Sequence, residues 1–293
     1  MLKIHTAVLC LSIALLSFNL TGCTSNVPRI NNNPAFTHTD TPPSTTTPTS
    51  TIKPTDTSPP PETPTITPTP TSVYDHLSCN TPKSLMLHSA FGETRMKALA
   101  QVIIDNGLQT ITYRQMMEYI LQGICPPENA IIVSLDDMGT SWLRPVFKDM
   151  IQAFTDRGLV LVAGVVTHSE QDPEIWEYLR QIETQGIEIA SHSINHLTFT
   201  AISDQALEKE IVGSYDMICD FLGTCPISLI LPGGHGGDDP RVYEISKGRY
   251  AFLVGIQGGR SFSNAPPYYL GRIPPNNDDQ TITLTLLENS FLP

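Results

Sequence analysis

The stretch Gly186–His196, which reads Gly-Ile-Glu-Ile-Ala-Ser-His-Ser-Ile-Asn-His, decides how the rest of the chain is interpreted. Its apolar first half is typical of a short buried strand, so His192 and His196 follow where that strand should end. If residues 192–196 form one helical turn, their i,i+4 spacing places both imidazoles on one face, where they can hold a metal ion. Two imidazoles need a third ligand, preferably an oxygen.

A second apolar run, residues 130–135, ends in the adjacent carboxylates Asp136 and Asp137. Side chains alternate across a regular strand, so both acids can enter one pocket only where the strand ends and the chain turns. One acid can then bind the metal while the other stays free as a base. Taken alone, His-x-x-x-His can be a polar helix face, and Asp-Asp can be a helix-starting turn. Their occurrence together, each after an apolar strand, favours a site.

The order Ser-Leu-Asp-Asp (residues 134–137) and then His-Ser-Ile-Asn-His (residues 192–196) resembles the polysaccharide deacetylases of the NodB-homology group, carbohydrate esterase family 4. Their motifs read Thr-Phe-Asp-Asp-Gly and His-Ser/Thr-x-x-His. The lead-in Leu-Met-Leu-His-Ser at residues 85–89 resembles the branch related to poly-N-acetylglucosamine deacetylases. The resemblance covers roughly residues 84–287.

This resemblance implies a separate role for each of the four motif residues. Asp137, His192 and His196 would bind a divalent metal, most simply Zn²⁺, although Co²⁺, Ni²⁺ or Mn²⁺ also suit such ligands. Asp136 would be the catalytic base that takes a proton from water. The implied reaction is hydrolysis of N-acetyl groups on a glycan, with release of acetate.

The sequence departs from the family pattern in three places. Met138 replaces the glycine of the first motif, no arginine precedes Pro232, and no histidine follows His235 in the printed chain. The acid that protonates the departing amine is therefore open between protonated Asp136, His235 and water. His235 has the alternative of an exposed loop residue. We expect the substrate to contact residues after two strands, which are His88, Pro232, Gly233 and Gly234.

Alternating strand and helix patterns fill residues 84–256. Strands are expected near 84–88, 109–112, 131–135, 159–166, 187–191, 227–231 and 250–256, with helices near 93–106, 113–122, 144–157, 173–185, 203–222 and 240–247. This alternation predicts an α/β fold of parallel strands, a distorted or incomplete (β/α)7-type barrel. In such a barrel both motifs lie at the carboxyl ends of the strands, where active sites are built.

The first 72 residues have a different composition from the rest. An apolar core from Ala7 to Leu20 precedes Cys23, which predicts a lipoprotein signal peptide over 1–22 and lipidation of Cys23. Residues 23–72 are rich in Thr, Pro and Ser, which predicts a disordered stalk. Residues 73–293 then form the deacetylase-like domain. The expected location is outside the bacterial cytoplasmic membrane or on the cell surface, anchored by lipid.

Charge and cysteine content limit the partners. The net charge of −12 and the absence of a Lys/Arg cluster argue against nucleic acid or an anionic glycan as a partner and favour a neutral or cationic glycan. Leaving out Cys10 and Cys23, an exported protein would have four cysteines, which allow three pairings. We favour Cys219–Cys225 and Cys79–Cys125, with unpaired buried thiols as the alternative. The oligomeric state is not predicted.

These observations predict a membrane-tethered, metal-dependent deacetylase of N-acetylated, N-acetylglucosamine-containing glycans of the cell envelope. Two alternatives remain at this point. One is a degenerate member that binds glycan as a surface lipoprotein without catalysis, which the missing arginine and late histidine favour. The other is an amide or imide hydrolase that uses the same metal site on a non-glycan substrate.

Overall fold

A computed structural model describes residues 79, 81–256 and 266–274 of this chain. The expected signal peptide, Cys23, the stalk and the proposed boundary at residues 72 and 73 lie outside the described residues. Among the described helices, none is both long and apolar enough to cross a membrane.

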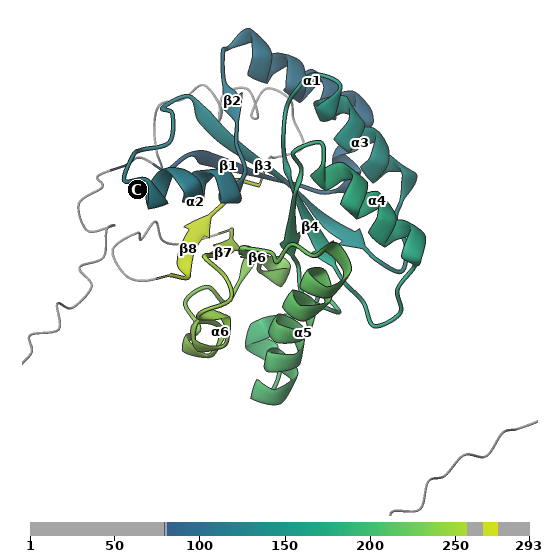
Figure 1. Cartoon of the computed structure of the whole chain (residues 1–293), viewed down its shortest axis with the longest axis vertical. Helices are drawn as coiled ribbons and strands as arrows, with labels where there is room; N and C mark the ends of the chain where they lie inside the picture. The colour runs from purple at the N-terminus through teal and green to yellow at the C-terminus, as the bar shows by residue number, and fades with distance from the viewer. Residues whose placement is uncertain (1–78, 80, 257–265, 275–293) are drawn as a thin grey trace, which may run out of the picture. The chain divides into compact units, whose positions relative to one another are not determined.

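The described residues contain one sheet of parallel strands (Figure 1). Its order is β1-β3-β4-β5-β6-β7-β8, and β2 pairs with the first two residues of β3. The strands are β1 (Lys83–Leu87), β2 (Gln109–Thr110), β3 (Ala130–Gly139), β4 (Val162–Val166), β5 (Glu188–Ser191), β6 (Ser228–Ile230), β7 (Phe252–Gly255) and β8 (Tyr268–Gly271).

The two edges of this sheet meet just beyond β8. The Ile273 amide donates to the Ser84 carbonyl at 2.8 Å, and the Met86 amide donates to the Ile273 carbonyl at 3.0 Å. Ile273, two residues after the last strand, thus hydrogen-bonds to the first strand, which nearly closes the barrel. The expected distorted (β/α)7 barrel is confirmed.

Helices connect the strands and pack outside the sheet (Figure 1). They are α1 (Gly92–Asp105), α2 (Tyr113–Leu121), α3 (Pro145–Thr155), α4 (Pro173–Glu183), α5 (Asp204–Leu222) and α6 (Pro240–Ser246), with short 3-10 turns η2 (Ser89–Phe91), η3 (Phe199–Ala201) and η4 (Pro232–Gly234). Their starts follow local chemistry. Thr112 and Gln115 form a capping box before α2, and the Ser203 side chain caps α5.

The core has an outer and an inner layer. The outer layer packs one face of the sheet against α1, α3 and α4. The inner layer fills the barrel with side chains from successive strands, including Ile132, Val162 and Ile230, and joins them to buried residues of α2. The barrel is therefore a packed body, and chemistry is confined to its rim.

Strand β8 was not expected from the sequence. It begins directly after Pro266 and Pro267, and proline cannot donate to a sheet ladder, so the sequence favours a turn there. Its neighbour β7 supplies the pairing that makes it a strand, with Phe252 opposite Tyr268 in register. The seven other strands and all six helices overlap the expected ranges.

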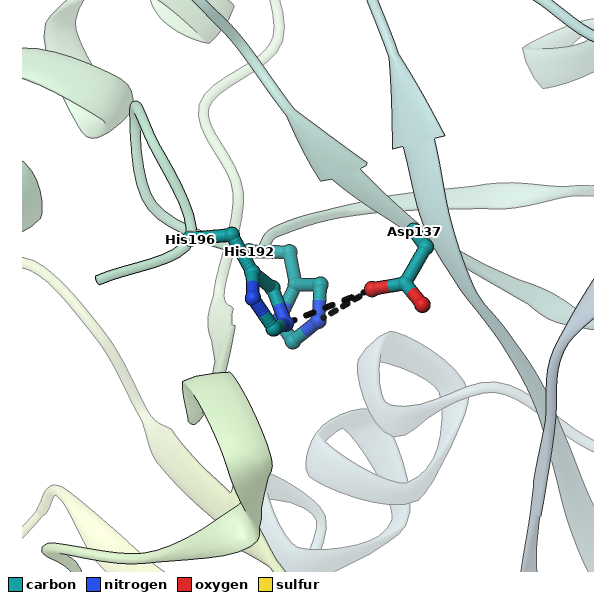
Figure 2. Close-up of side chains that lie close together, drawn as sticks. All are labelled: Asp137, His192 and His196. Atoms are coloured by element: carbon teal, nitrogen blue, oxygen red, sulfur yellow. Dashed lines mark ion pairs between the residues drawn. The ribbon is translucent and has the colours of Figure 1, made fainter. Parts of the chain in front are cut away.

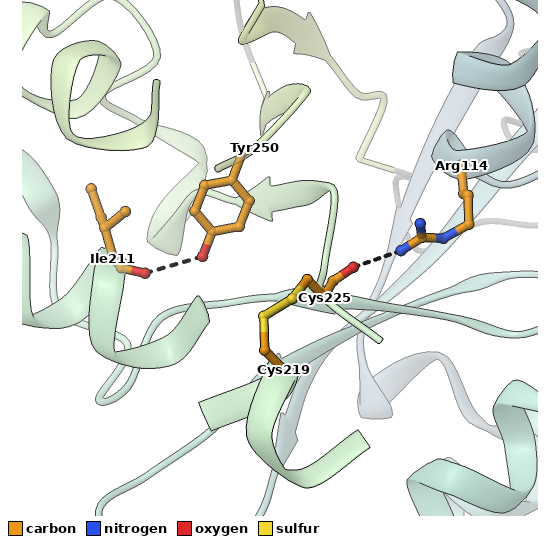
Figure 3. The surroundings of a disulfide bond; sticks show 5 residues. All are labelled: Arg114, Ile211, Cys219, Cys225 and Tyr250. Atoms are coloured by element: carbon orange, nitrogen blue, oxygen red, sulfur yellow. Dashed lines mark hydrogen bonds between the residues drawn. A yellow bond between two sulfur atoms is a disulfide. The ribbon is translucent and has the colours of Figure 1, made fainter. Parts of the chain in front are cut away.

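Two disulfides join the pairs expected from the sequence, Cys79–Cys125 and Cys219–Cys225. The second links the last turns of α5 to the segment before β6 (Figure 3). Beside it, Arg114 Nη2 at the start of α2 donates to the Cys225 carbonyl at 2.7 Å. The disulfide and this hydrogen bond fix the amino-terminal end of β6.

Candidate metal centre and active site

Asp136 and Asp137 face the same site because β3 is irregular. The pairing of β3 with β4 shifts register between Leu135 and Met138, and Asp137 has a left-handed backbone with φ of 65°. The sequence predicted a turn after residue 135, whereas the strand continues to Gly139 with a bulge. A bulge re-aims neighbouring side chains as a turn would. Met138, which replaces the family glycine, is buried.

Asp136 is buried and held by a cation. Arg272 Nη1 lies 2.8 Å from each carboxylate oxygen of Asp136 and also donates to Ser134 Oγ at 2.7 Å. The facing residue on β4 is Gly164, where a Cβ would come within 3.3 Å of Asp136 Oδ1. The sequence has no arginine before Pro232, where the family pattern has one. The structure supplies this cation from the end of β8.

The backbone of residues 192–196 is not the expected helical turn. After β5 ends at Ser191, the chain bends, with positive φ at Ser193 (66°) and His196 (56°). The two histidines still converge, with ring centroids 4.6 Å apart. The prediction of a shared face was right, and the predicted helix was wrong.

A buried carboxylate from α5 shapes this bend. Glu210 Oε2 accepts hydrogen bonds from the backbone amides of Ile194 at 3.0 Å and Asn195 at 2.8 Å, and its Oε1 accepts from Asn195 Nδ2 at 2.7 Å. These bonds replace the helical hydrogen bonds that the backbone would otherwise make. Glu210 therefore determines where His196 points. This role could not be predicted from the sequence, because there Glu210 is one more acid on an amphipathic helix.

His192 is fixed in one tautomer. Its Nδ1 lies 2.8 Å from the Ile230 carbonyl oxygen in β6, and the ring is 2% exposed. Because a carbonyl can only accept, Nδ1 carries the proton and the Nε2 lone pair is free. This arrangement is the usual outer support of a metal-binding histidine.

Asp137, His192 and His196 form a possible metal site (Figure 2). The Nε2 atoms of both histidines lie 3.3 Å from Asp137 Oδ1, and the three ligand atoms lie within 4.8 Å of one another. Two imidazoles and a carboxylate on one side leave room for other ligands, which fits a catalytic divalent metal such as zinc.

The surroundings favour the ligand forms of these groups. The neighbouring His192 imidazole, whose effect outweighs that of burial, lowers the pKa of Asp137. Burial first, and then the neighbouring His192, lower the pKa of His196, so this imidazole stays neutral to lower pH than usual. Metals bind carboxylate and neutral imidazole, so both shifts prepare the site.

The other expected site residues divide into two groups. His88 joins the centre, with Nε2 3.7 Å from Asp137 Oδ2, the oxygen turned away from the two metal-binding histidines. His235 is exposed beyond η4 and lies outside the Asp137, His192 and His196 cluster. Pro232, Gly233 and Gly234 form η4 after β6. None of these three lines the pocket beside Asp137.

A pocket of about 280 Å³ opens beside the metal ligands. It is lined by Ser89, Asp137, Trp142, Arg144, Phe147, Val166, His168 and His196. Trp142 is 40% exposed there. Residues from η2, β3, α3, β4 and the loops after β3, β4 and β5 thus meet at the carboxyl ends of the strands, as the barrel predicted.

Comparisons with known proteins agree with this geometry. The sequence model described as polysaccharide deacetylase matches residues 123–249. YxkH of Bacillus subtilis, which carries a provisional polysaccharide deacetylase designation, is 25% identical over 196 residues, covering 67% of this chain and 68% of YxkH.

Two solved structures share the fold. The Streptococcus pyogenes deacetylase PplD, in complex with acetate, aligns with a TM-score of 0.59 and 14% identity, covering 71% of this chain and 97% of PplD. IcaB from Ammonifex degensii aligns with a TM-score of 0.56 and 15% identity, covering 69% of this chain and 94% of IcaB. The family match over residues 123–249, the similarity to YxkH and the residues at the strand ends all support the resemblance of this chain to the polysaccharide deacetylases, the NodB-homology group.

Proposed function

We propose that this protein hydrolyses N-acetyl groups on an N-acetylglucosamine-containing glycan of the cell envelope in a metal-dependent reaction that releases acetate. The observation that carries the proposal is the convergence of Asp137, His192 and His196 beside an Asp136 held by Arg272. The three ligands fit a divalent metal, and the adjacent carboxylate fits a base.

Asp137, His192 and His196 would hold the metal, and Asp136 would do the proton transfer. A divalent metal bound there would acidify a water molecule and polarise the acetyl carbonyl. Asp136 accepts the proton of the attacking water, and Arg272 holds its carboxylate in place for this task. The water oxygen bonds to the acetyl carbon, the C–N bond breaks, and acetate and an amine result.

The departing amine needs a proton, and His88 is the best-placed donor. It faces the side of Asp137 opposite the two metal-binding histidines, whereas His235 is exposed outside the cluster. His88 comes directly after β1, a rigid element of the barrel. We therefore assign the acid to His88 and keep His235 as the alternative.

The degenerate glycan-binding alternative loses one of its two supports. It rested on a missing arginine and a missing late histidine. Arg272 fills the first gap by position, and His88 can fill the second. Sequence and geometry give no specific support to an amide or imide substrate that is not a glycan.

Elemental analysis of the purified protein, together with acetate release from N-acetylglucosamine oligomers before and after chelation, tests the proposal. We expect near-stoichiometric metal and chelator-sensitive release, both lost in Asp137→Ala and His192→Ala. Asp105→Ala removes an exposed carboxylate at the end of α1 and should change neither. Metal-independent release, or no release with metal bound, would refute the proposed function.

Location is a separate proposal. A lipid on Cys23 would tether the domain outside the cytoplasmic membrane through the Thr/Pro-rich segment. The two disulfides support an exported protein, since such bonds persist in oxidising compartments. Cys23→Ala should move the protein from the membrane fraction to the soluble fraction. Retention in the membrane fraction would contradict the anchor.

A further inference from the structure

Arg144 places a positive charge on the rim of the candidate active site. It precedes the first residue of α3 and lines the same pocket as Asp137 and His196. The proposed function assigns it no task, because deacetylating a neutral sugar requires no cation at this point. A charge in the substrate pocket therefore needs its own explanation.

The guanidinium of Arg144 is held in place by two neighbours. Its central carbon lies 4.8 Å from the centroid of the Trp142 ring, and its Nη1 donates to Ser89 Oγ at 3.3 Å. Stacking on an aromatic ring orients a guanidinium and leaves most of its N–H donors free for other partners. Arg144 is thus more ordered than a typical exposed arginine.

Trp142 is itself fixed by close packing. A Cβ at Gly139 would lie 2.9 Å from Trp142 Nε1 and 2.8 Å from His168 Nε2, so only glycine lets both rings approach the backbone there. Gly139 and Trp142 also form an isolated antiparallel bridge. The indole is therefore a rigid support for the cation at the mouth of the pocket.

Arg144 has no ion-pair partner among the described residues. Arg180, Arg241 and Arg272 each lie within 4.0 Å of a carboxylate, and Arg144 does not. The one carboxylate in its pocket, Asp137, faces three imidazoles. The negative net charge of the chain does not cancel this cation, because exposed charges beyond about 8 Å are largely screened at physiological salt.

We propose that Arg144 is a specificity residue that binds a carboxylate of the glycan. The preferred substrate would then carry a carboxylate on the N-acetylated sugar or on its neighbour in the chain. Guanidinium and carboxylate match as a two-point hydrogen-bonded pair, which a neutral hydroxyl cannot reproduce. This inference rests on the proposed function for the placement of the acetamide and refines its substrate from a neutral to an acidic glycan.

The test compares two glycans that differ in one group. One is an oligomer alternating N-acetylglucosamine with its 3-O-lactyl ether, and the other is the same oligomer with each lactyl carboxyl reduced to an alcohol. Calorimetric titration into the purified protein gives the two dissociation constants, and the recovered glycans are assayed for released acetate. We expect about tenfold tighter binding of the carboxylated oligomer, the scale of one charge-assisted pair.

Three variants locate the effect. Arg144→Gln should bring the ratio of dissociation constants close to one. Arg144→Lys should give an intermediate ratio, because lysine keeps the charge but lacks the planar pair of N–H donors that matches a carboxylate. Lys148→Gln removes a charge of the same sign from α3, outside the pocket, and should keep the full ratio. A wild-type ratio of one, or a full ratio in Arg144→Gln, would overturn the inference. Failure to release acetate from either glycan would refute the proposed function instead, because the binding ratio is measured independently of turnover.

Discussion

Arg272 Nη1 lies 2.8 Å from both carboxylate oxygens of Asp136, although the two residues are 136 positions apart in the chain. Their side chains are 0% and 2% exposed. A buried ion pair adds little net stability, because desolvation offsets the attraction, but removal of one partner leaves a costly unpaired charge. The Arg272–Asp136 pair therefore links the stability of the fold to the position of the proposed base.

Replacing Arg272 should cost both stability and activity. For Arg272→Met we expect the free energy of unfolding to fall by about 3–5 kcal/mol, since Asp136 would be left buried without its cation. Adding Asp136→Asn should recover much of this loss and none of the acetate release. Urea denaturation of the two single variants and the double variant measures the coupling.

Arg249→Met is the matched control, because Arg249 is exposed in the turn after α6 and its replacement should change stability by no more than about 0.5 kcal/mol. An Arg272→Met protein as stable as wild type would show that the pair does not hold the site.

Periodicity predicted the barrel because each of its signals is local. The apolar runs before Asp136 and His192, the prolines at helix starts and the capping residues all act within a few positions. The same locality gave the two histidines and the pair of carboxylates, since the barrel brings the carboxyl ends of its strands together, whereas the choice of Asp137 as the ligand came from the family resemblance. Predicting that these side chains meet required only the correct strands and their order in the barrel.

Arg272 and Glu210 could not be predicted, because their roles depend on distant partners. Arg272 follows β8, a strand that the preceding prolines made difficult to predict. Its contact with Asp136 forms only because the barrel closes. Glu210 occupies an ordinary helix position and becomes a support only because α5 packs beside the His196 loop. The expected helical turn failed for the same reason, since Glu210 takes over the backbone amides of that loop.

Glu210 should control metal affinity without touching the metal. Glu210→Ala removes three hydrogen bonds from the loop before His196, so we expect metal affinity to fall by about 10–100-fold, as for other supports of metal ligands. Titration of apo-protein with Zn²⁺ measures this. Glu208→Ala, an exposed acid on the same helix, is the control. Equal affinities in the two variants would contradict the role.

His88 and His235 give opposite predictions for the proton donor. If His88 protonates the departing amine, His88→Ala should lower kcat for acetate release by about 100-fold, within the usual range for general acids. His235→Ala should leave kcat nearly unchanged. Metal content must be measured in both, since His88 lies near Asp137. A larger loss in His235→Ala would reverse the assignment.

Metal retention should depend on pH in a direction set by the ligands. Metal binds neutral imidazole, and burial lowers the pKa of His196, so protons compete for this ligand only at pH values below the usual range for histidine. We expect constant metal content from pH 8 down to about 6.5, and loss below that. Elemental analysis after dialysis at each pH measures it. Loss beginning between pH 8 and 7 would show that His196 is not neutralised by its surroundings.

Glu188 provides a pH-dependent contribution to stability at the opposite end of β5. Its Oε2 accepts from the Arg114 amide at 2.7 Å and its Oε1 from Ser228 Oγ at 2.8 Å. Burial nevertheless raises the pKa of Glu188, because these hydrogen bonds do not repay the lost hydration of the charge. The folded state thus holds this proton to higher pH than the unfolded state does.

The sign of the effect follows from the raised pKa. The contribution is complete below the unfolded value of 4.5 and is lost as pH rises through the folded value. Glu188→Gln keeps two hydrogen-bonding atoms and carries no charge, so its stability relative to wild type should increase above pH 4.5, by about 1.4 kcal/mol per pH unit until the folded pKa is passed. Urea denaturation from pH 4.5 to 8 measures the difference in free energy of unfolding between the two proteins. The contributions of all other titrating groups cancel in this difference. Glu208→Gln should show no such rise, and a pH-independent difference for Glu188→Gln would mean that Glu188 is charged throughout in the folded protein.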